Sequence, residues 1–274
     1  RESRQAFGAL GPTYVKLAQL IASSPGLFPE ILSEELRSLL DRVPPVLPAH
    51  IEDVVLGELG APPEEVFASF DPVPLASASI AQVHAAVLRD GTDVVVKVQR
   101  PGIRARLAAD LRILSVAARL IERASQQGRM ANPIAVVEDF EATLAHELNF
   151  VLEAEAMERF AENLSSFGNN TGVRVPQVHW RYTTRRVLTM ERVYGHRLDD
   201  SEGLRATGFD LPGLLKRGVR AWMEAALEHG FFHGDVHAGN LMVHTDGTVV
   251  CLDFGIVGHL DDRPRDIIRH GLPA

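Results

Sequence analysis

The chain has 274 residues, of which 46% are hydrophobic and 23% charged, so it can bury a large core and is typical of a globular rather than a disordered protein. Its formal net charge is −8, with 28 basic against 36 acidic residues, which argues against nucleic acid as a partner. The single cysteine, Cys251, excludes an internal disulfide, and its apolar neighbours predict a buried side chain.

The two ends of the chain and its apolar runs set further expectations. No run of 18 apolar residues occurs, so the chain is expected to have no transmembrane helix of its own. The sequence begins at Arg1 rather than at methionine, and 19 residues follow Gly255 (274 − 255). We therefore expect a segment of a longer protein, with any signal or membrane anchor outside it.

The first 48 residues are predicted to be helical, with a start signal at Gly11-Pro12-Thr13 and a second helix over 29–41. A third helix is expected over 50–59. Lys16 and Gln19 are three residues apart and share a helix face beside an apolar stripe. Spacing alone favours a solvated Lys16.

Lysine is rare in this chain: it occurs only at positions 16, 97 and 216, so 25 of the 28 basic residues are arginine (28 − 3). Where arginine is the default cation, a lysine indicates a position that needs a compact ammonium group. Lys97 follows three valines in a predicted strand, where a buried ammonium needs an anionic partner. A phosphate together with a helix carboxylate would provide one, and an edge-strand lysine that reaches water is the alternative.

Strands are expected from Val66 onward, with a loop of small residues before Lys97. The loop comprises Ala76, Ser77, Ala78 and Ser79. Small side chains let backbone N–H groups approach phosphates, although such a loop is more often an ordinary turn.

Two long helices are predicted next, over 103–127 and 133–164. The second carries Glu147, Asn149 and Glu153, and on one regular helix Glu147 and Glu153 would point about 120° apart. Spacing does not decide which acid faces Lys97, because the helix carries several others.

The second half of the chain is expected to continue with strands over 173–180 and 185–193, a link between lobes at Tyr194-Gly195 and a helix over 211–228. The inward side chains expected on this last helix are Leu215, Val219, Trp222 and Ala226.

A phosphoryl-transfer centre is predicted around His233-Gly234-Asp235-Val236-His237-Ala238-Gly239-Asn240 and Asp253-Phe254-Gly255. Asp235 and Asn240 are five apart, which suits a carboxylate that accepts a hydroxyl proton and an amide oxygen that holds a metal. Asp246-Gly247 lies between two apolar runs and predicts a hairpin that places Asn240 beside Asp253. Two such oxygens suffice for a nucleotide-bound Mg²⁺, which completes its ligands with phosphate and water. An ordinary loop is the alternative.

These motifs together resemble the UbiB (AarF, ADCK) family of atypical protein-kinase-like proteins over nearly the whole chain. The family's KxGQ, ExD and HGDxHPGN motifs look like 16–19, 147–149 and 233–240, and its Ala-rich loop looks like 76–79. Ala18, Asn149 and Ala238 depart from the usual Gly, Asp and Pro. The resemblance implies that Asn149 removes a carboxylate from an acidic cluster facing the KxGQ helix and the metal site, so we expect metal affinity or the docking of that helix to be altered.

The resemblance implies an α+β, protein-kinase-like two-lobed fold: a helical extension over 1–60, an N-lobe over 61–194 and a truncated C-lobe over 195–274. It implies that the side chains of Lys16 and Gln19 point toward the active site. It also implies that Glu153 pairs with Lys97. The backbone of the hinge 190–193 would contact adenine, at Glu191 and Val193. The implied ligands are ATP or ADP and Mg²⁺. The implied function is ATPase or kinase activity that supports isoprenoid quinone biosynthesis, with quinone-biosynthesis proteins or membrane lipid as partners and a cytoplasmic location at a membrane.

Two other functions compete with this one. A phosphotransferase of the aminoglycoside or choline kinase kind also carries HGD and GN signals but lacks the Lys16 helix and the Ala-rich loop. A nucleotide-gated scaffold without turnover is the third, and the retained Asp235, Asn240 and Asp253 argue against it. Independently of the family, Gly234 stands where regulated protein kinases carry the Arg of HRD, which predicts no switching by activation-loop phosphorylation.

Overall fold

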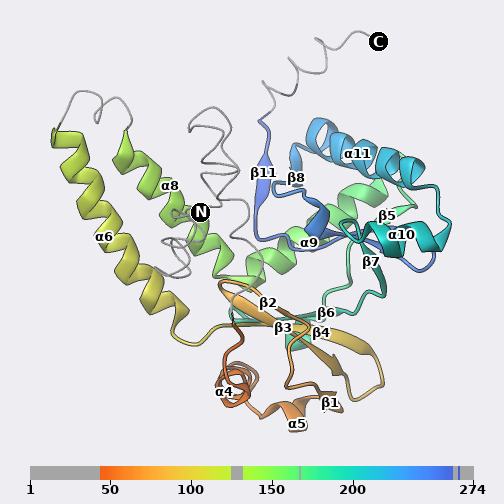
Figure 1. The fold of residues 1–274 in the computed structure, drawn as a ribbon, viewed down its shortest axis with the longest axis horizontal. Coiled ribbons are helices and arrows are strands. Elements are labelled where there is room, and N and C mark those ends of the chain that lie inside the picture. Colours follow the sequence, from red (N-terminus) through yellow and green to blue (C-terminus); the bar gives the residue numbers. More distant parts are fainter. Residues whose placement is uncertain (1–43, 125–131, 167, 262–264, 266–274) are drawn as a thin grey trace. The chain divides into compact units, whose positions relative to one another are not determined.

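A computed structural model describes residues 44–124, 132–166, 168–261 and 265 (Figure 1). Lys16, Ala18 and Gln19, with the helices expected before residue 44, lie outside the described residues. The chain divides into two compact units, one of residues 1–92 and 96–148 and the other of 93–95 and 149–274. The lobe boundaries expected at residues 60 and 194 stay predictions.

The first unit contains helices α4 (Pro48–Leu59) and α5 (Pro63–Val66) and part of a β-sheet. Gly60 ends α4 in the left-handed conformation, as its position after the last turn predicts. In the sheet, β3 (Ala81–Val87) lies between β1 (Ser69–Phe70) and β4 (Asp93–Gln99). A short strand, β2 (Ala76–Ser77), also pairs with β3. The change to strand structure expected after Val66 is therefore confirmed.

Two helices complete this unit and pack side by side: α6 (Ile103–Ala124) and α8 (Pro133–Glu147) (Figure 1). The single helix predicted over 133–164 is wrong. The chain leaves α8 at Glu147 and starts a new helix, α9 (Phe150–Ser166), in the second unit. Asn149 explains the break, because its Oδ1 accepts the Val151 N–H at 3.3 Å as a helix N-cap.

The second unit is built on a four-stranded sheet of order β5-β10-β9-β7. Its strands are β5 (Val173–Arg174), β7 (Gly195–Arg197), β9 (Leu241–His244) and β10 (Val249–Cys251). A second pair of strands, β8 (Phe231–His233) and β11 (Val257–His259), runs antiparallel. The single Cys251 is buried as predicted, and burial raises the pKa of its thiol to about 12.

Two predicted strands of this unit are shorter than expected. The strand over 173–180 is limited to β5, with an isolated bridge at Val178 and a 3₁₀ turn, η1, over Trp180–Tyr182. Pro176 has no N–H to donate to a ladder, which explains the early end. The next strand, β6, spans Val187–Glu191 within the predicted 185–193.

Helices α10 (Ser201–Thr207), α11 (Leu211–Glu228) and α9 belong to the same unit. The inward face predicted for α11 is wrong at Leu215 and Val219, which are 48% and 62% exposed. The buried residues are instead Leu214, Ala221, Ala225 and Ala226. The packed face of α11 consists mainly of alanines at helical spacing. The larger Leu215 and Val219, which the prediction placed inward, lie on a different face. Among the described helices, none is long and apolar enough to cross a membrane.

Candidate functional site

The loop between β8 and β9 positions Asp235 and Asn240. A short 3₁₀ turn, η2 (Ala238–Asn240), leads directly into β9. The Asn240 side-chain N–H donates to the Asp235 carbonyl oxygen at 3.0 Å, which ties the two ends of the loop together. This bond occupies the amide nitrogen of Asn240 and leaves its Oδ1 as the atom suited to a cation.

The predicted hairpin is confirmed and brings Asp253 to Asn240. In β9 and β10, Val243 pairs with Val249 and Leu241 with Cys251. The Leu252 N–H then donates to the Asn240 carbonyl oxygen at 2.8 Å. Asp253 is the next residue, so the amide and the carboxylate lie at the same end of the hairpin.

His233 joins the HGD loop to the segment before Asp253. Its ring is 1% exposed, and Nε2 lies 2.8 Å from the Leu252 carbonyl oxygen. The Asp235 N–H donates to Nδ1 at 3.1 Å, so the proton of the neutral ring is on Nε2. The first histidine of the motif therefore has a positioning role, which spacing alone did not indicate.

Phe254 anchors the same segment from its other side. Its buried ring lies 4.7 Å from the His233 ring and 5.1 Å from the ring of Phe160 on α9. Asp253 precedes it in the left-handed conformation with φ 54°, uncommon for a residue other than glycine. Such conformations concentrate at functional sites, where surrounding packing holds them. Here Phe254 is buried while Asp253 remains exposed.

The donor set at this end of the hairpin fits Mg²⁺. Asn240 and Asp253 offer an amide oxygen and a carboxylate, the hard ligands that this ion takes together with phosphate and water. Among the described residues, no group of three or more His, Cys, Asp or Glu side chains is arranged to hold a metal. The fit therefore rests on two protein ligands completed by a nucleotide.

The N-terminal end of α9 carries two further predicted site positions. Asn149 caps the helix, and Glu153 lies in its first turn with 4% of its surface exposed. Asn and Asp serve equally well as N-caps, so the departure from the family's Asp preserves the cap and removes only the charge. Glu147 is buried at the end of α8, in the other unit.

Lys97 and the small-residue loop lie in the first unit. Lys97 is buried in β4 between Val96 and Val98, as predicted, and only 9% of it is exposed. Its pairing with Glu153 stays a prediction, because the two belong to different units.

The small-residue loop is the turn of the β2–β3 hairpin. Ala76 and Ser77 form β2, and the Ala78 N–H donates to the Ala81 carbonyl oxygen at 2.9 Å. The Arg100 guanidinium donates to the Ala78 carbonyl at 2.8 Å and to the Ser77 hydroxyl at 2.7 Å. Sequence reasoning missed this positioning role of Arg100, since nothing in its neighbours signals it. Ser79 is buried beside this turn.

Of the two residues predicted to contact adenine from the hinge, the backbone N–H of Glu191 is hydrogen-bonded among the described residues and that of Val193 is not. Glu191 uses its own N–H on the Gln177 carbonyl at 2.8 Å and its carboxylate on Arg174 at 2.8 Å. Within the described part of the chain, the Val193 N–H has no hydrogen-bond partner. The next residue, Tyr194, donates its hydroxyl to Asp93 at 3.0 Å.

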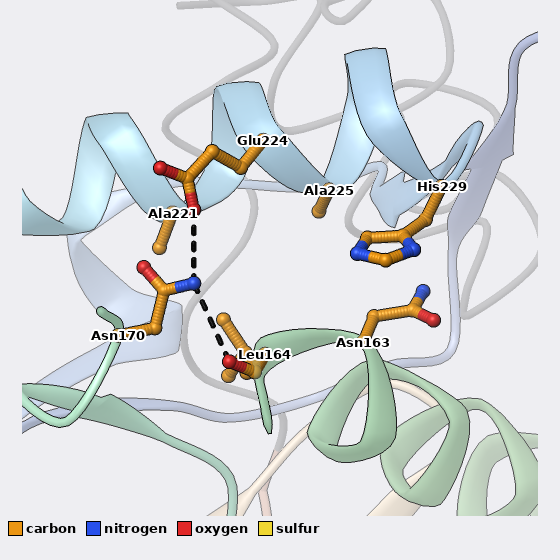
Figure 2. Close-up of a pocket in the computed structure, with 7 residues that line it drawn as sticks. All are labelled: Asn163, Leu164, Asn170, Ala221, Glu224, Ala225 and His229. Atoms are coloured by element: carbon orange, nitrogen blue, oxygen red, sulfur yellow. Dashed lines mark hydrogen bonds between the residues drawn. The ribbon is translucent and has the colours of Figure 1, made fainter. Parts of the chain in front are cut away.

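A shallow pocket between α9 and α11 is separate from these residues (Figure 2). It is too small to admit a water molecule. Figure 2 shows Asn170 bridging Leu164 and Glu224, with bonds of 3.4 and 2.9 Å. Hydrogen bonds from Arg220 and Asn170 lower the pKa of Glu224. This cluster clamps the two helices and contains none of the predicted site residues.

The sequence of this chain is similar to a known protein family and to several known proteins. A family model described as the ABC1 atypical kinase-like domain matches residues 38–273. The uncharacterized protein Rv0647c of Mycobacterium tuberculosis (strain H37Rv) is 52% identical over 269 residues, covering 98% of this chain and 55% of that protein. The probable protein kinase UbiB of Azotobacter vinelandii is 40% identical over 275 residues, covering 99% and 51%. The chain thus spans about half the length of these curated relatives.

One solved structure is also similar. The complex of Rv3197 with erythromycin from Mycobacterium tuberculosis matches with a TM-score of 0.61 and 30% identity. The match covers 89% of this chain and 59% of that one. It is consistent with the α+β class predicted from the sequence.

Proposed function

Because the chain belongs to the ABC1 atypical kinase-like family, the UbiB group that its motifs predict, we propose that it binds ATP with Mg²⁺ and transfers or hydrolyses the γ-phosphoryl group. The observation that carries the proposal is the joining of Asn240, Asp253 and Asp235 at one end of a hairpin. These are the groups that phosphoryl transfer requires for a metal and for a nucleophile.

Each residue has a defined part in this proposal. Asp235 accepts the proton of an attacking water or hydroxyl, and Asn240 fixes the loop that carries it. Asn240 and Asp253 would hold Mg²⁺, which neutralises charge on the β- and γ-phosphates when bound. Lys97 contacts phosphate from β4, with Glu153 as its carboxylate partner. Lys16 and Gln19, which lie outside the described residues, are proposed to act on the same nucleotide because the family resemblance implies it.

The test is phosphate release from ATP by the complete protein, with and without Mg²⁺. Asp235→Asn and Asp253→Asn are each expected to lower turnover by about 10²-fold or more, as loss of an electrostatic group at a transition state does. Asp246→Asn is the matched control, because Asp246 is at the turn of the same hairpin, away from Asn240. Equal turnover in all four proteins would refute the proposal. Nucleotide binding without turnover in the wild type would favour the scaffold function instead.

A small-molecule acceptor is a second candidate, since a relative of 30% identity was solved with erythromycin. If the acceptor is of this kind, incubation with ATP, Mg²⁺ and erythromycin should add a phosphoryl group detectable by mass spectrometry. If erythromycin neither changes the rate of phosphate release nor becomes phosphorylated, the acceptor is water or another molecule.

We propose a membrane surface as a partner, on the basis of α6. Four apolar side chains of this helix are each more than half exposed: Ile113, Val116, Leu120 and Ile121. Their spacing places them on one face, and Arg112, Arg119 and Arg123 flank it at helical spacing. An apolar stripe beside a row of cations suits an anionic bilayer surface, although the whole chain is acidic.

Co-sedimentation with vesicles of phosphatidylglycerol and phosphatidylcholine tests this surface. Leu120→Glu should weaken binding to the anionic vesicles, whereas Val219→Glu, an equally exposed apolar position on α11, should not. Equal binding by both variants would contradict the assignment, and a change in oligomeric state alone would indicate a second copy as the occupant. At such a membrane, the protein would support isoprenoid quinone biosynthesis together with quinone-biosynthesis proteins.

A further inference from the structure

His237 lies beside Asp235 in the loop between β8 and β9 and has no role in the proposed function so far. Its Nε2 is 3.7 Å from Asp235 Oδ2, and the two side chains are 47% and 42% exposed. This distance is too long for a hydrogen bond. Both groups can therefore contact a third group from solvent.

The hydrogen bond at its other nitrogen fixes which atom His237 presents. The Gly239 N–H donates to His237 Nδ1 at 3.0 Å, so Nδ1 is an acceptor and the ring proton is on Nε2. The backbone adds to this, because the Asn240 N–H donates to the His237 carbonyl oxygen at 2.9 Å. The loop thus holds an Nε2–H donor near the Asp235 carboxylate.

Gly239 is the residue that permits this ring position. A Cβ added there would lie 2.8 Å from His237 Cε1 and 2.9 Å from Nδ1. It would also lie 2.6 Å from an Arg197 guanidinium nitrogen, which brings a cation of β7 to the same loop. A side chain at position 239 would therefore clash with the His237 ring, which explains why this position holds a glycine.

We propose that His237 is a catalytic residue whose Nε2–H donates to an oxygen of the γ-phosphoryl group as it is transferred, an inference that rests on the proposed function. In this step the nucleophile oxygen forms a bond to the γ-phosphorus. The bond from phosphorus to the bridging oxygen breaks, and ADP leaves with that electron pair. The nucleophile's proton passes to Asp235. A fixed donor beside the nucleophile stabilises charge on the transferred group.

Two substitutions separate this role from a structural one. Asn places an acceptor near the position of Nδ1 and can keep the Gly239 bond, but it lacks the distal donor. Gln places an N–H near the position of Nε2 and lacks the proximal acceptor. We expect His237→Asn to lower kcat about 10²-fold with ADP affinity unchanged, and His237→Gln to retain most of the wild-type kcat.

The reverse order would overturn the proposal: wild-type kcat in His237→Asn and a loss in His237→Gln would show that only the Gly239 bond matters. The ratio of ATP to ADP affinity provides a reading that does not need turnover. A γ-phosphoryl contact predicts that His237→Asn lowers this ratio. If the wild type shows no turnover, the proposed function fails, and an unchanged ratio would then also refute the role of His237.

Discussion

Asn149 replaces the aspartate of the ExD motif, and its position explains how the fold accommodates the change. Its Oδ1 accepts the Val151 N–H at the start of α9. The cap needs only an oxygen acceptor, which an amide supplies as well as a carboxylate. The sequence could show the departure but not this compensation, because it predicted one continuous helix through Asn149.

Substitution at Asn149 should separate capping from charge. Asn149→Ala is expected to lower the free energy of unfolding by about 1 kcal/mol, the usual cost of a lost N-cap. Asn149→Asp should leave stability unchanged or slightly higher, because a carboxylate also interacts favourably with the helix N-terminus. Urea denaturation measures both. Equal stability of the Ala and Asp variants would contradict the capping role.

Asp246, at the turn of the β9–β10 hairpin, makes a pH-dependent contribution to the stability of the fold. Hydrogen bonds from the Thr248 side chain and backbone, then from His244, lower its pKa from 3.8 to about 2. Because the folded pKa is the lower one, this stabilisation is complete above about pH 4 and is lost as the pH falls toward 2. The Tm difference between wild type and Asp246→Ala should therefore narrow over that range. A constant difference would contradict the assignment.

At the scale of elements, the β9–β10 hairpin was the most predictable part of the site. An Asp-Gly turn between apolar runs determines its register, and the register places Asn240 beside Asp253. The contacts that hold the hairpin in place were not predictable, because they join segments that are distant in the sequence. These are the hydrogen bond from His233 to Leu252 and the ring contact between Phe254 and Phe160. The face of α11 was mispredicted for a similar reason, because the neighbouring elements, and not its own pattern, determine which residues pack.

Gly234 connects the catalytic loop to Ile256, the residue before β11, and packs closely against it. Its N–H donates to the Ile256 carbonyl at 3.0 Å, and an added Cβ would lie 3.0 Å from Ile256 Cγ2 and 3.2 Å from that carbonyl oxygen. Gly234→Ala is therefore expected to lower the free energy of unfolding by about 1–3 kcal/mol.

Gly218→Ala, within α11, is the matched control for Gly234→Ala. A Cβ there would meet only Val249 Cγ1 at 3.9 Å, and alanine favours a helix. It should be neutral or stabilising in the same denaturation experiment. If Gly234→Ala were as stable as this control, the close packing would be wrong. The same packing bears on the expected lack of activation-loop switching, since an arginine at position 234 would face the same neighbours.

For the whole molecule, the α+β class, the family and most element types followed from the sequence, because the motifs are local and their spacing is regular. Pairings between distant segments did not follow. Arg100 shows this, since the contacts that hold the small-residue turn depend on tertiary structure alone. Lys97 was predicted from its run of valines and only Glu153 from family position, and their ion pair stays a prediction.

Calorimetric titration of the complete protein with ATP tests whether Asn240 and Asp253 hold a nucleotide-bound magnesium ion. We expect tight binding with Mg²⁺, much weaker binding with EDTA, and loss of this difference in Asp253→Asn. The Asp246→Asn control should behave as the wild type. Equal affinity with and without Mg²⁺ in the wild type, or a Mg²⁺ dependence unchanged by Asp253→Asn, would show that these two residues do not hold the ion.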